Sequence, residues 1–147
     1  MIRIKRVRAI SSKVIVNFTP HSFAEWMRMR PIRWNFYRRA KGLWVLYSGK
    51  LPLCVIGVEP TSWLGTGAEV FFLLCKGGQR KARQLVTFLR RAFRHMLRCF
   101  PRLVVSVEAD FWIGARFVEF FGFHPFTEVR ELAGVKYKTY EMRAPWL

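Results

Sequence analysis

The chain has 147 residues, 52% of them hydrophobic, and its 26 basic and 9 acidic residues give a formal net charge of +17. This length suits one compact domain, and the longest uncharged apolar runs, such as Leu51 to Val58, fall far short of the ~20 residues that cross a bilayer. The basic N-terminus lacks the apolar core and cleavage site of a secretory signal, so we expect a soluble intracellular protein.

The basic charge is unevenly distributed along the chain. Met1 to Val107 holds 21 basic and 3 acidic residues, a net of +18, whereas Glu108 to Leu147 holds 5 basic and 6 acidic residues, a net of −1. Such a field is typical of contact with nucleic acid, an anionic partner surface or an acidic membrane. A solvated basic surface that binds nothing anionic has the same composition, so both interpretations stay open at this point.

Cysteine and histidine give no sign of a metal site or a disulfide framework. Cys54, Cys75 and Cys99 are odd in number, widely spaced and set in apolar surroundings. The three histidines have no cluster of cysteines or carboxylates beside them. We therefore expect three buried free thiols and no metal.

The first third of the chain predicts an edge strand followed by a helical region. Met1 to Ala9 alternates loosely, and its interleaved arginines would discourage pairing with another chain. Pro20 to Met29 predicts a helix that Pro31 ends. In Ile32 to Gly42 aromatic residues alternate with cations, which suits either stacking on single-stranded nucleic acid or a helix with buried aromatics; we favour the second.

The middle of the chain predicts three strands and a long basic helix. Leu43 to Tyr47 and Leu51 to Val58 form a hairpin around Ser48-Gly49-Lys50, and a third strand runs from Glu69 to Cys75 after a glycine-rich loop at 65–67. The helix runs roughly from Gln79 to Phe100, with an expected core stripe of Val86, Leu89, Phe93, Met96 and Phe100. Its opposite side is expected to expose Arg83, Arg91, Arg94 and Arg98.

The last third predicts a buried strand, a short helix and a closing hairpin. Leu103 to Val107 is an apolar strand, Asp110 offers an N-cap oxygen, and Gly122 supplies a helix stop. Phe126 to Leu132 and Val135 to Met142 form the hairpin. The expected buried face of the short helix consists of Ile113, Phe117, Phe120 and Phe121.

This order predicts an α/β (α+β) domain over residues 1–147, with a mixed, mostly antiparallel sheet and helices on both faces. From end to end it resembles the GNAT acyl-CoA N-acyltransferase fold. Three features in register resemble more closely the GNAT-like internal virion proteins of short-tailed bacteriophages. They are Gly49-Lys50-Leu51-Pro52-Leu53, Gly78-Gln79-Arg80-Lys81-Ala82-Arg83, and Ala115-Arg116-Phe117 near Gly122.

The GNAT resemblance implies a coenzyme A pyrophosphate site where the third strand passes into the long helix, in an Arg/Gln-x-x-Gly-x-Gly/Ala pattern. Aligned on Leu85, the last small position is Ala82, but Arg80 replaces the inner glycine and Gly77 replaces the first Arg/Gln. A shifted register that uses Gly77 and Gly78 as the phosphate loop stays open. The implied cofactor-binding residues are Cys75, Lys76, Gly77, Gly78, Gln79 and Arg80.

The same resemblance implies two catalytic groups, of which one is missing. The tyrosine that protonates the departing thiolate in this family is replaced by Val118, which carries no proton. The carboxylate that deprotonates the amine would be Glu69. Glu59 is the alternative base, and either residue could also be an ordinary charge at a strand end.

Two function hypotheses follow from these residues. The leading one is a catalytically degenerate GNAT-fold bacteriophage protein, a virion-associated or assembly component in the virion or host cytoplasm. It would require no cofactor and would use Arg83, Arg91, Arg94 and Arg98 against DNA or an acidic virion protein. The alternative is an active acetyl-CoA-dependent N-acyltransferase.

Overall fold

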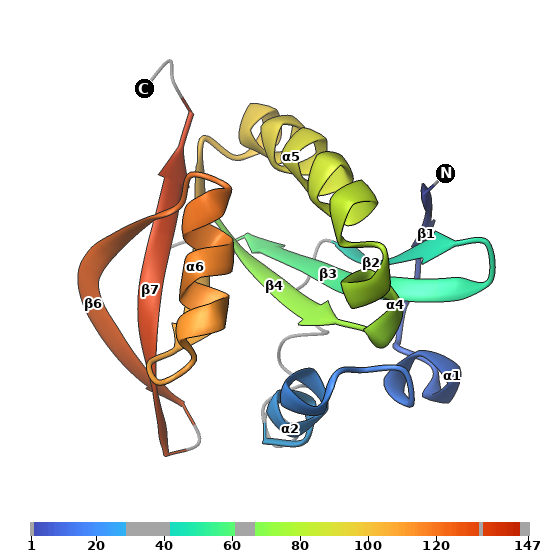
Figure 1. Cartoon of the computed structure of the whole chain (residues 1–147). Helices are drawn as coiled ribbons and strands as arrows, with labels where there is room; N and C mark the ends of the chain where they lie inside the picture. Colours follow the sequence, from blue (N-terminus) through green and yellow to red (C-terminus); the bar gives the residue numbers. More distant parts are fainter. Residues whose placement is uncertain (1, 29–41, 61–66, 133, 145–147) are drawn as a thin grey trace. The chain divides into compact units, whose positions relative to one another are not determined.

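The computed structural model describes residues 2–28, 42–60, 67–132 and 134–144 (Figure 1). The expected helical region 32–41 and most of the glycine-rich loop lie outside the described residues. The elements in chain order are β1 (Ile2–Arg6), α1 (Ser12–Ile15), α2 (Pro20–Arg28), β2 (Gly42–Ser48), β3 (Leu51–Pro60), β4 (Ala68–Leu74), α4 (Lys76–Arg80), α5 (Ala82–Cys99), β5 (Arg102–Glu108), α6 (Trp112–Phe120), β6 (His124–Leu132) and β7 (Val135–Arg143).

The chain divides into two compact units, Met1–Glu59 with Phe71–Ala92 and Pro60–Val70 with Phe93–Leu147. In the first unit the strand order is β1-β2-β3-β4, with antiparallel β1/β2 and β2/β3 pairs. In the second unit the start of β4 pairs in parallel with β5, and antiparallel β7 and β6 follow. The predicted mixed, mostly antiparallel sheet is confirmed, while the single domain stays a prediction.

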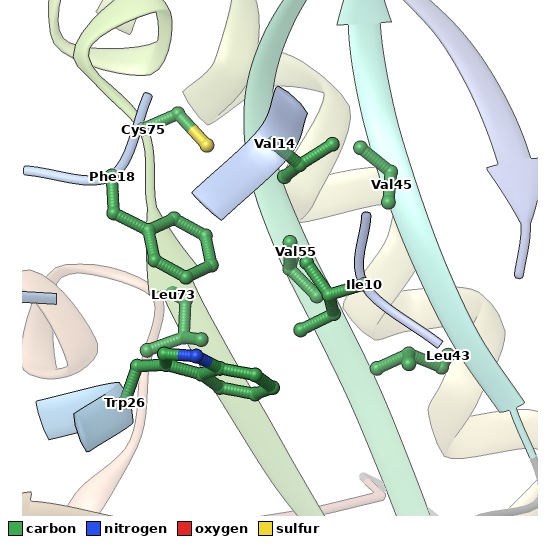
Figure 2. Packing of buried hydrophobic residues seen from close by; sticks show 9 residues of the cluster. All are labelled: Ile10, Val14, Phe18, Trp26, Leu43, Val45, Val55, Leu73 and Cys75. Atoms are coloured by element: carbon green, nitrogen blue, oxygen red, sulfur yellow. The ribbon is translucent and has the colours of Figure 1, made fainter. Parts of the chain in front are cut away.

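One face of the first unit's strands packs against α1 and α2. The buried side chains form one cluster (Figure 2), which consists of Ile10, Val14, Phe18, Trp26, Leu43, Val45, Val55, Leu73 and Cys75. Phe18 and Trp26 meet edge to face, with ring centroids 6.1 Å apart. Helix α2 begins with Pro20 at its first position, and Thr19 caps it, because the Ser22 N–H donates to Thr19 Oγ1 at 3.3 Å.

The opposite face of the same strands packs against α4 and the start of α5. Leu74 follows Leu73 in the strand and therefore points to the other side, where it lies beside Gly78 and Leu85. A Cβ on Gly77 would lie 2.6 Å from the Pro52 carbonyl oxygen, and one on Gly78 would overlap the Leu53 carbonyl oxygen. The helices therefore cover both faces of this unit's strands, as predicted, and α4 approaches β3 at a distance that only glycine permits.

This close packing makes Gly78 a sensitive position. We expect Gly78→Ala to lower the free energy of unfolding by about 1–3 kcal/mol, the usual penalty for adding a methyl group to a well-packed contact. The matched control is Gly49→Asn, because Gly49 has a φ of 61°, a Cβ added there would meet no atom within 4 Å, and asparagine tolerates that conformation. Urea unfolding of both variants measures the difference; equal, small losses would contradict the packing role.

The buried stripe of α5 is rotated relative to the sequence prediction. Leu89 and Phe93 are buried as expected, but Val86, Met96 and Phe100 are only partly buried, and Leu85 and Leu97 take their places. Both sets of residues are apolar and recur every three or four positions, so periodicity alone does not separate them. In the second unit Phe93 contacts the rings of Phe121 and Phe123, each at a centroid distance of 5.3 Å.

Two predictions for α6 are wrong. Its N-cap is Phe111 and not Asp110, and no side chain caps it. Ile113 and Phe120, which were expected to be buried, are 56% and 57% exposed, because α6 packs through Val118 instead. The predicted stop is confirmed, since Gly122 has a φ of 97°.

The cysteines divide into two buried thiols and one exposed thiol. Burial raises the pKa of Cys75 to about 12, and burial followed by the neighbouring Cys75 raises the pKa of Cys54 well above its ordinary value. Cys99 is exposed, so the expectation of three buried thiols is wrong for this residue. It lies on the solvent side of the last turn of α5, whereas Leu97 points to the core.

This difference predicts a thiol titration in two stages. At pH 8 a disulfide reagent such as DTNB should rapidly modify one thiol of the folded protein, because the thiolate is the reactive form and only Cys99 is accessible. In denaturant all three cysteines should react. Cys99→Ser should abolish the fast phase, and a fast phase that survives this substitution would contradict the assignment.

Candidate functional site

The predicted base, Glu69, lies near the start of β4 in the second unit and forms an ion pair. Its Oε1 accepts a hydrogen bond from Arg130 Nη1 at 2.9 Å, and the same nitrogen lies 3.5 Å from Ser106 Oγ. The Glu69 side chain is 21% exposed and that of Arg130 is 26% exposed. The carboxylate is therefore held in one orientation but remains accessible to water and small solutes.

The end of β4 is anchored in the first unit by α2 and by the segment that precedes it. The Thr19 N–H donates to the Leu74 carbonyl at 3.0 Å, and the Leu74 N–H donates to Ser22 Oγ at 3.0 Å. The Lys76 N–H donates to the Asn17 carbonyl at 2.8 Å. Thr19 and Ser22 are buried polar residues, and these bonds satisfy backbone groups that β4 would otherwise leave unpaired at its end.

The predicted cofactor-binding residues Cys75 to Arg80 form the short helix α4 and the residue before it. Three backbone amides of α4 already donate hydrogen bonds within the protein. The Lys76 N–H donates to the Asn17 carbonyl, and the Gly78 and Gln79 N–H groups donate to the Cys75 carbonyl at 3.0 and 3.4 Å. Cys75, Gly77 and Gly78 are buried, so only the side chains of Lys76, Gln79 and Arg80 reach solvent. In this segment the groups available to an anion are mainly side chains.

The next backbone amides available to an anion are those at the start of α5. The first helical bond joins the Leu85 N–H to the Lys81 carbonyl at 3.0 Å. The amides of residues 82–84 precede it, and no acceptor for them is found in the described parts of the chain. The side chains of Arg80, Lys81 and Arg83 are exposed around this turn. A helix N-terminus of this kind favours a negatively charged group.

The position expected for the catalytic tyrosine is apolar and closed. Val118 is 8% exposed, and its carbonyl accepts the Phe123 N–H at 3.2 Å in the turn that ends α6. The second unit instead buries Tyr140 on β7, where burial and, to a lesser degree, the charge of Glu119 raise the pKa of the phenol. Sequence reasoning missed Arg130 and Ser106 beside Glu69, and the buried Tyr140, since these placements depend on the strand register.

The four arginines predicted on the basic side of the long helix, Arg83, Arg91, Arg94 and Arg98, are all exposed on α5. By contrast, Arg102 and Arg143 pair with Glu141 at 2.5 and 3.2 Å, and Arg130 pairs with Glu69. No carboxylate among the described residues pairs with any of the four α5 arginines.

The described residues hold no group of three or more histidine, cysteine or acidic side chains that could bind a metal ion. Within the same residues no helix has both the length and the apolar character needed to span a membrane.

Comparisons with known proteins identify the fold. No family model and no curated protein matches the chain. Among solved structures, an IAA acetyltransferase from Bacillus cereus matches 98% of this chain and 100% of its own length, with a TM-score of 0.68 and 15% identity. A Bacillus subtilis acetyltransferase in complex with CoA matches 98% of this chain and 99% of its own, with a TM-score of 0.69 and 10% identity.

A third solved structure, a GNAT family acetyltransferase from Elizabethkingia anophelis with acetyl-CoA bound, matches 97% of this chain and 98% of its own. Its TM-score is 0.66 and its identity 12%. The predicted GNAT-like fold is therefore confirmed. At these identities the similarity concerns the fold alone, and the resemblance to phage virion proteins stays a prediction.

Proposed function

We propose that this chain is an acetyl-CoA-dependent N-acyltransferase that moves an acetyl group to an amine. The observation that supports this proposal is the similarity in fold to acetyltransferases over 97–98% of the chain, including one solved with CoA and one with acetyl-CoA. The proposal reverses the order of the two hypotheses drawn from the sequence, because this similarity favours the enzyme class.

The residues around the start of α5 suit the diphosphate of coenzyme A, although not through the amides of α4. Lys76, Arg80, Lys81 and Arg83 offer exposed cations, and the first turn of α5 offers the amides of residues 82–84. Arg80 would bind an anion through its guanidinium, which can donate two parallel hydrogen bonds. The bound cofactor would supply the acetyl thioester.

Glu69 is the proposed base. When the amine nitrogen bonds to the thioester carbonyl carbon, the carbon–sulfur bond breaks and Glu69 takes the proton that the amine loses. Arg130, whose Nη1 also donates to Ser106 Oγ, fixes the orientation of the carboxylate, and the 21% exposure of Glu69 leaves room for the amine to approach.

The position that the resemblance assigns to the catalytic tyrosine is Val118, so no phenol at that position would protonate the leaving thiolate. A thiol with a pKa near 8.5 leaves as a thiolate at little cost and is then protonated by water. General acid catalysis contributes roughly 10²–10⁴-fold in rate, so this chain should act slowly relative to an enzyme that has the tyrosine.

A calorimetric titration with acetyl-CoA tests the proposal. The wild-type chain should give saturable heat, and Arg80→Glu with Lys81→Glu should abolish it, because the two substitutions reverse the charge beside the first turn of α5. Glu69→Gln should bind acetyl-CoA as the wild type does but release CoA in the presence of a polyamine at least 100-fold more slowly.

Lys136→Glu with Lys138→Glu is the matched control for the binding variant, since both lysines are exposed and lie on β7 in the other unit. Substitutions of Gly77 or Gly78 are unsuitable, because they would disturb the packing of α4 on β3. No heat with the wild-type chain at millimolar acetyl-CoA would overturn the proposal.

A second candidate function is a catalytically degenerate component of a short-tailed phage particle or of its assembly, in the virion or host cytoplasm. Three observations favour it: the position of Val118, the replacement of a family glycine by Arg80, and the occupied amides of Lys76, Gly78 and Gln79. Such a protein would require no cofactor and would contact DNA or another virion protein through its basic surface.

Mass spectrometry of purified particles tests the second candidate. We expect the chain at stoichiometric levels in mature particles or in assembly intermediates of the phage that encodes it. Its absence from both, together with acetyl-CoA binding in the titration, would decide between the two functions in favour of the enzyme.

A further inference from the structure

We propose that an arginine face on α5, formed by Arg83, Arg91, Arg94 and Arg98, binds the phosphate backbone of duplex nucleic acid. The inference rests on the second candidate function, whose contact with DNA it assigns to named residues, and not on the acyltransferase proposal. It shares Arg83 with the acyltransferase proposal, which otherwise uses Lys76, Arg80, Lys81, the first turn of α5 and Glu69.

The four arginines share one side of a single continuous helix. With 3.6 residues per turn they fall within an arc of about 80°, and from Arg83 to Arg98 they extend over roughly 22 Å. All four are exposed, while Leu85, Leu89, Phe93 and Leu97 on the other side are buried. A duplex presents about 13 phosphate charges over such a length, so every arginine can find a phosphate without a change in the helix.

The protein does not neutralise this face. Residues 70–107 contain no acidic side chain. The ion pairs of the second unit's sheet use Arg102, Arg130 and Arg143. Within the described parts of the chain the four arginines have no carboxylate partner, so their counterions come from solution. Release of those counterions is the main driving force for non-specific binding to nucleic acid.

The composition of the face favours nucleic acid over an acidic protein or a membrane. A protein interface usually has an apolar or aromatic centre, and a membrane-binding helix exposes apolar side chains beside its cations. Leu85, Leu89, Phe93 and Leu97 are turned to the core, and Thr87, which lies between the arginines, donates its hydroxyl to the Arg83 carbonyl at 3.1 Å. The arc of α5 that holds the four arginines therefore contains no apolar side chain.

The test is fluorescence anisotropy of a labelled 20-bp duplex at several salt concentrations, with two sequences of equal length. The wild-type chain should bind both duplexes equally. In the quadruple variant Arg83→Gln, Arg91→Gln, Arg94→Gln and Arg98→Gln, the slope of log K against log salt should flatten by about 3 to 4 units, because each lost phosphate contact removes about 0.9.

The matched control replaces four exposed lysines that lie off this helix: Lys13→Gln, Lys50→Gln, Lys136→Gln and Lys138→Gln. It removes the same charge and should change the slope by less than about 1 unit. Both variants should keep the melting temperature, since glutamine has good helix propensity and none of the replaced side chains is buried.

Three outcomes would overturn the inference. Equal loss in both variants would mean that net charge and not the arginine face drives binding. Absence of binding by the wild-type chain at low salt would exclude a nucleic-acid site. Tighter binding to labelled poly-glutamate, or to vesicles with anionic lipid, than to the duplex would assign the face to an acidic protein or a membrane.

Discussion

The contact between α4 and β3 determines what the start of the long helix can present to a ligand. Gly77 and Gly78 have no side chains, so α4 lies directly on the carbonyl groups of Pro52 and Leu53. In this position the helical turn directs the Gly78 and Gln79 amides to the Cys75 carbonyl, and the Lys76 amide to Asn17. The two glycines therefore allow close packing of α4 on β3. The groups that could bind an anion are the Arg80 side chain and the backbone amides in the first turn of α5.

The arginines of the second unit's strands and the arginines of α5 differ in whether they have acidic partners. Most acidic residues belong to the last part of the chain, and in the second unit Glu69 and Glu141 pair with arginines of its strands. These pairs are partly buried, so they orient their members more than they stabilise the fold. The helix α5 has no acidic residue to offset its arginines. Arg83, Arg91, Arg94 and Arg98 therefore have no acidic partner among the described residues.

The sequence predicted most strands, the long helix and the Gly122 stop, because alternation, length and glycine position are local signals. It missed α1, which has four residues and no periodic pattern, and it chose the wrong apolar stripe on α5, where Val86 and Leu85 are equally apolar. It identified Glu69 from a family pattern but not Arg130. That partner comes from a strand 61 residues away, which only the three-dimensional pairing reveals.

The departures from the family pattern are physically coupled to one another. Because α4 is helical and packed on β3, a glycine at position 80 would not bring a backbone amide close to a phosphate. An arginine at this position therefore removes little anion binding by the backbone. Val118 likewise fits a closed, apolar turn in which a phenol would need a partner for its hydroxyl. Gly77, Gly78 and Gly122 serve the packing and the turn at the end of α6, while Arg80 and Val118 stand where the resemblance implies a phosphate-binding glycine and a proton-donating tyrosine. Under the proposed function, Glu69 would be the base, and side-chain cations would supplement the amides of residues 82–84, so acetyl-CoA binding would respond to salt more strongly than at a site built from backbone amides alone.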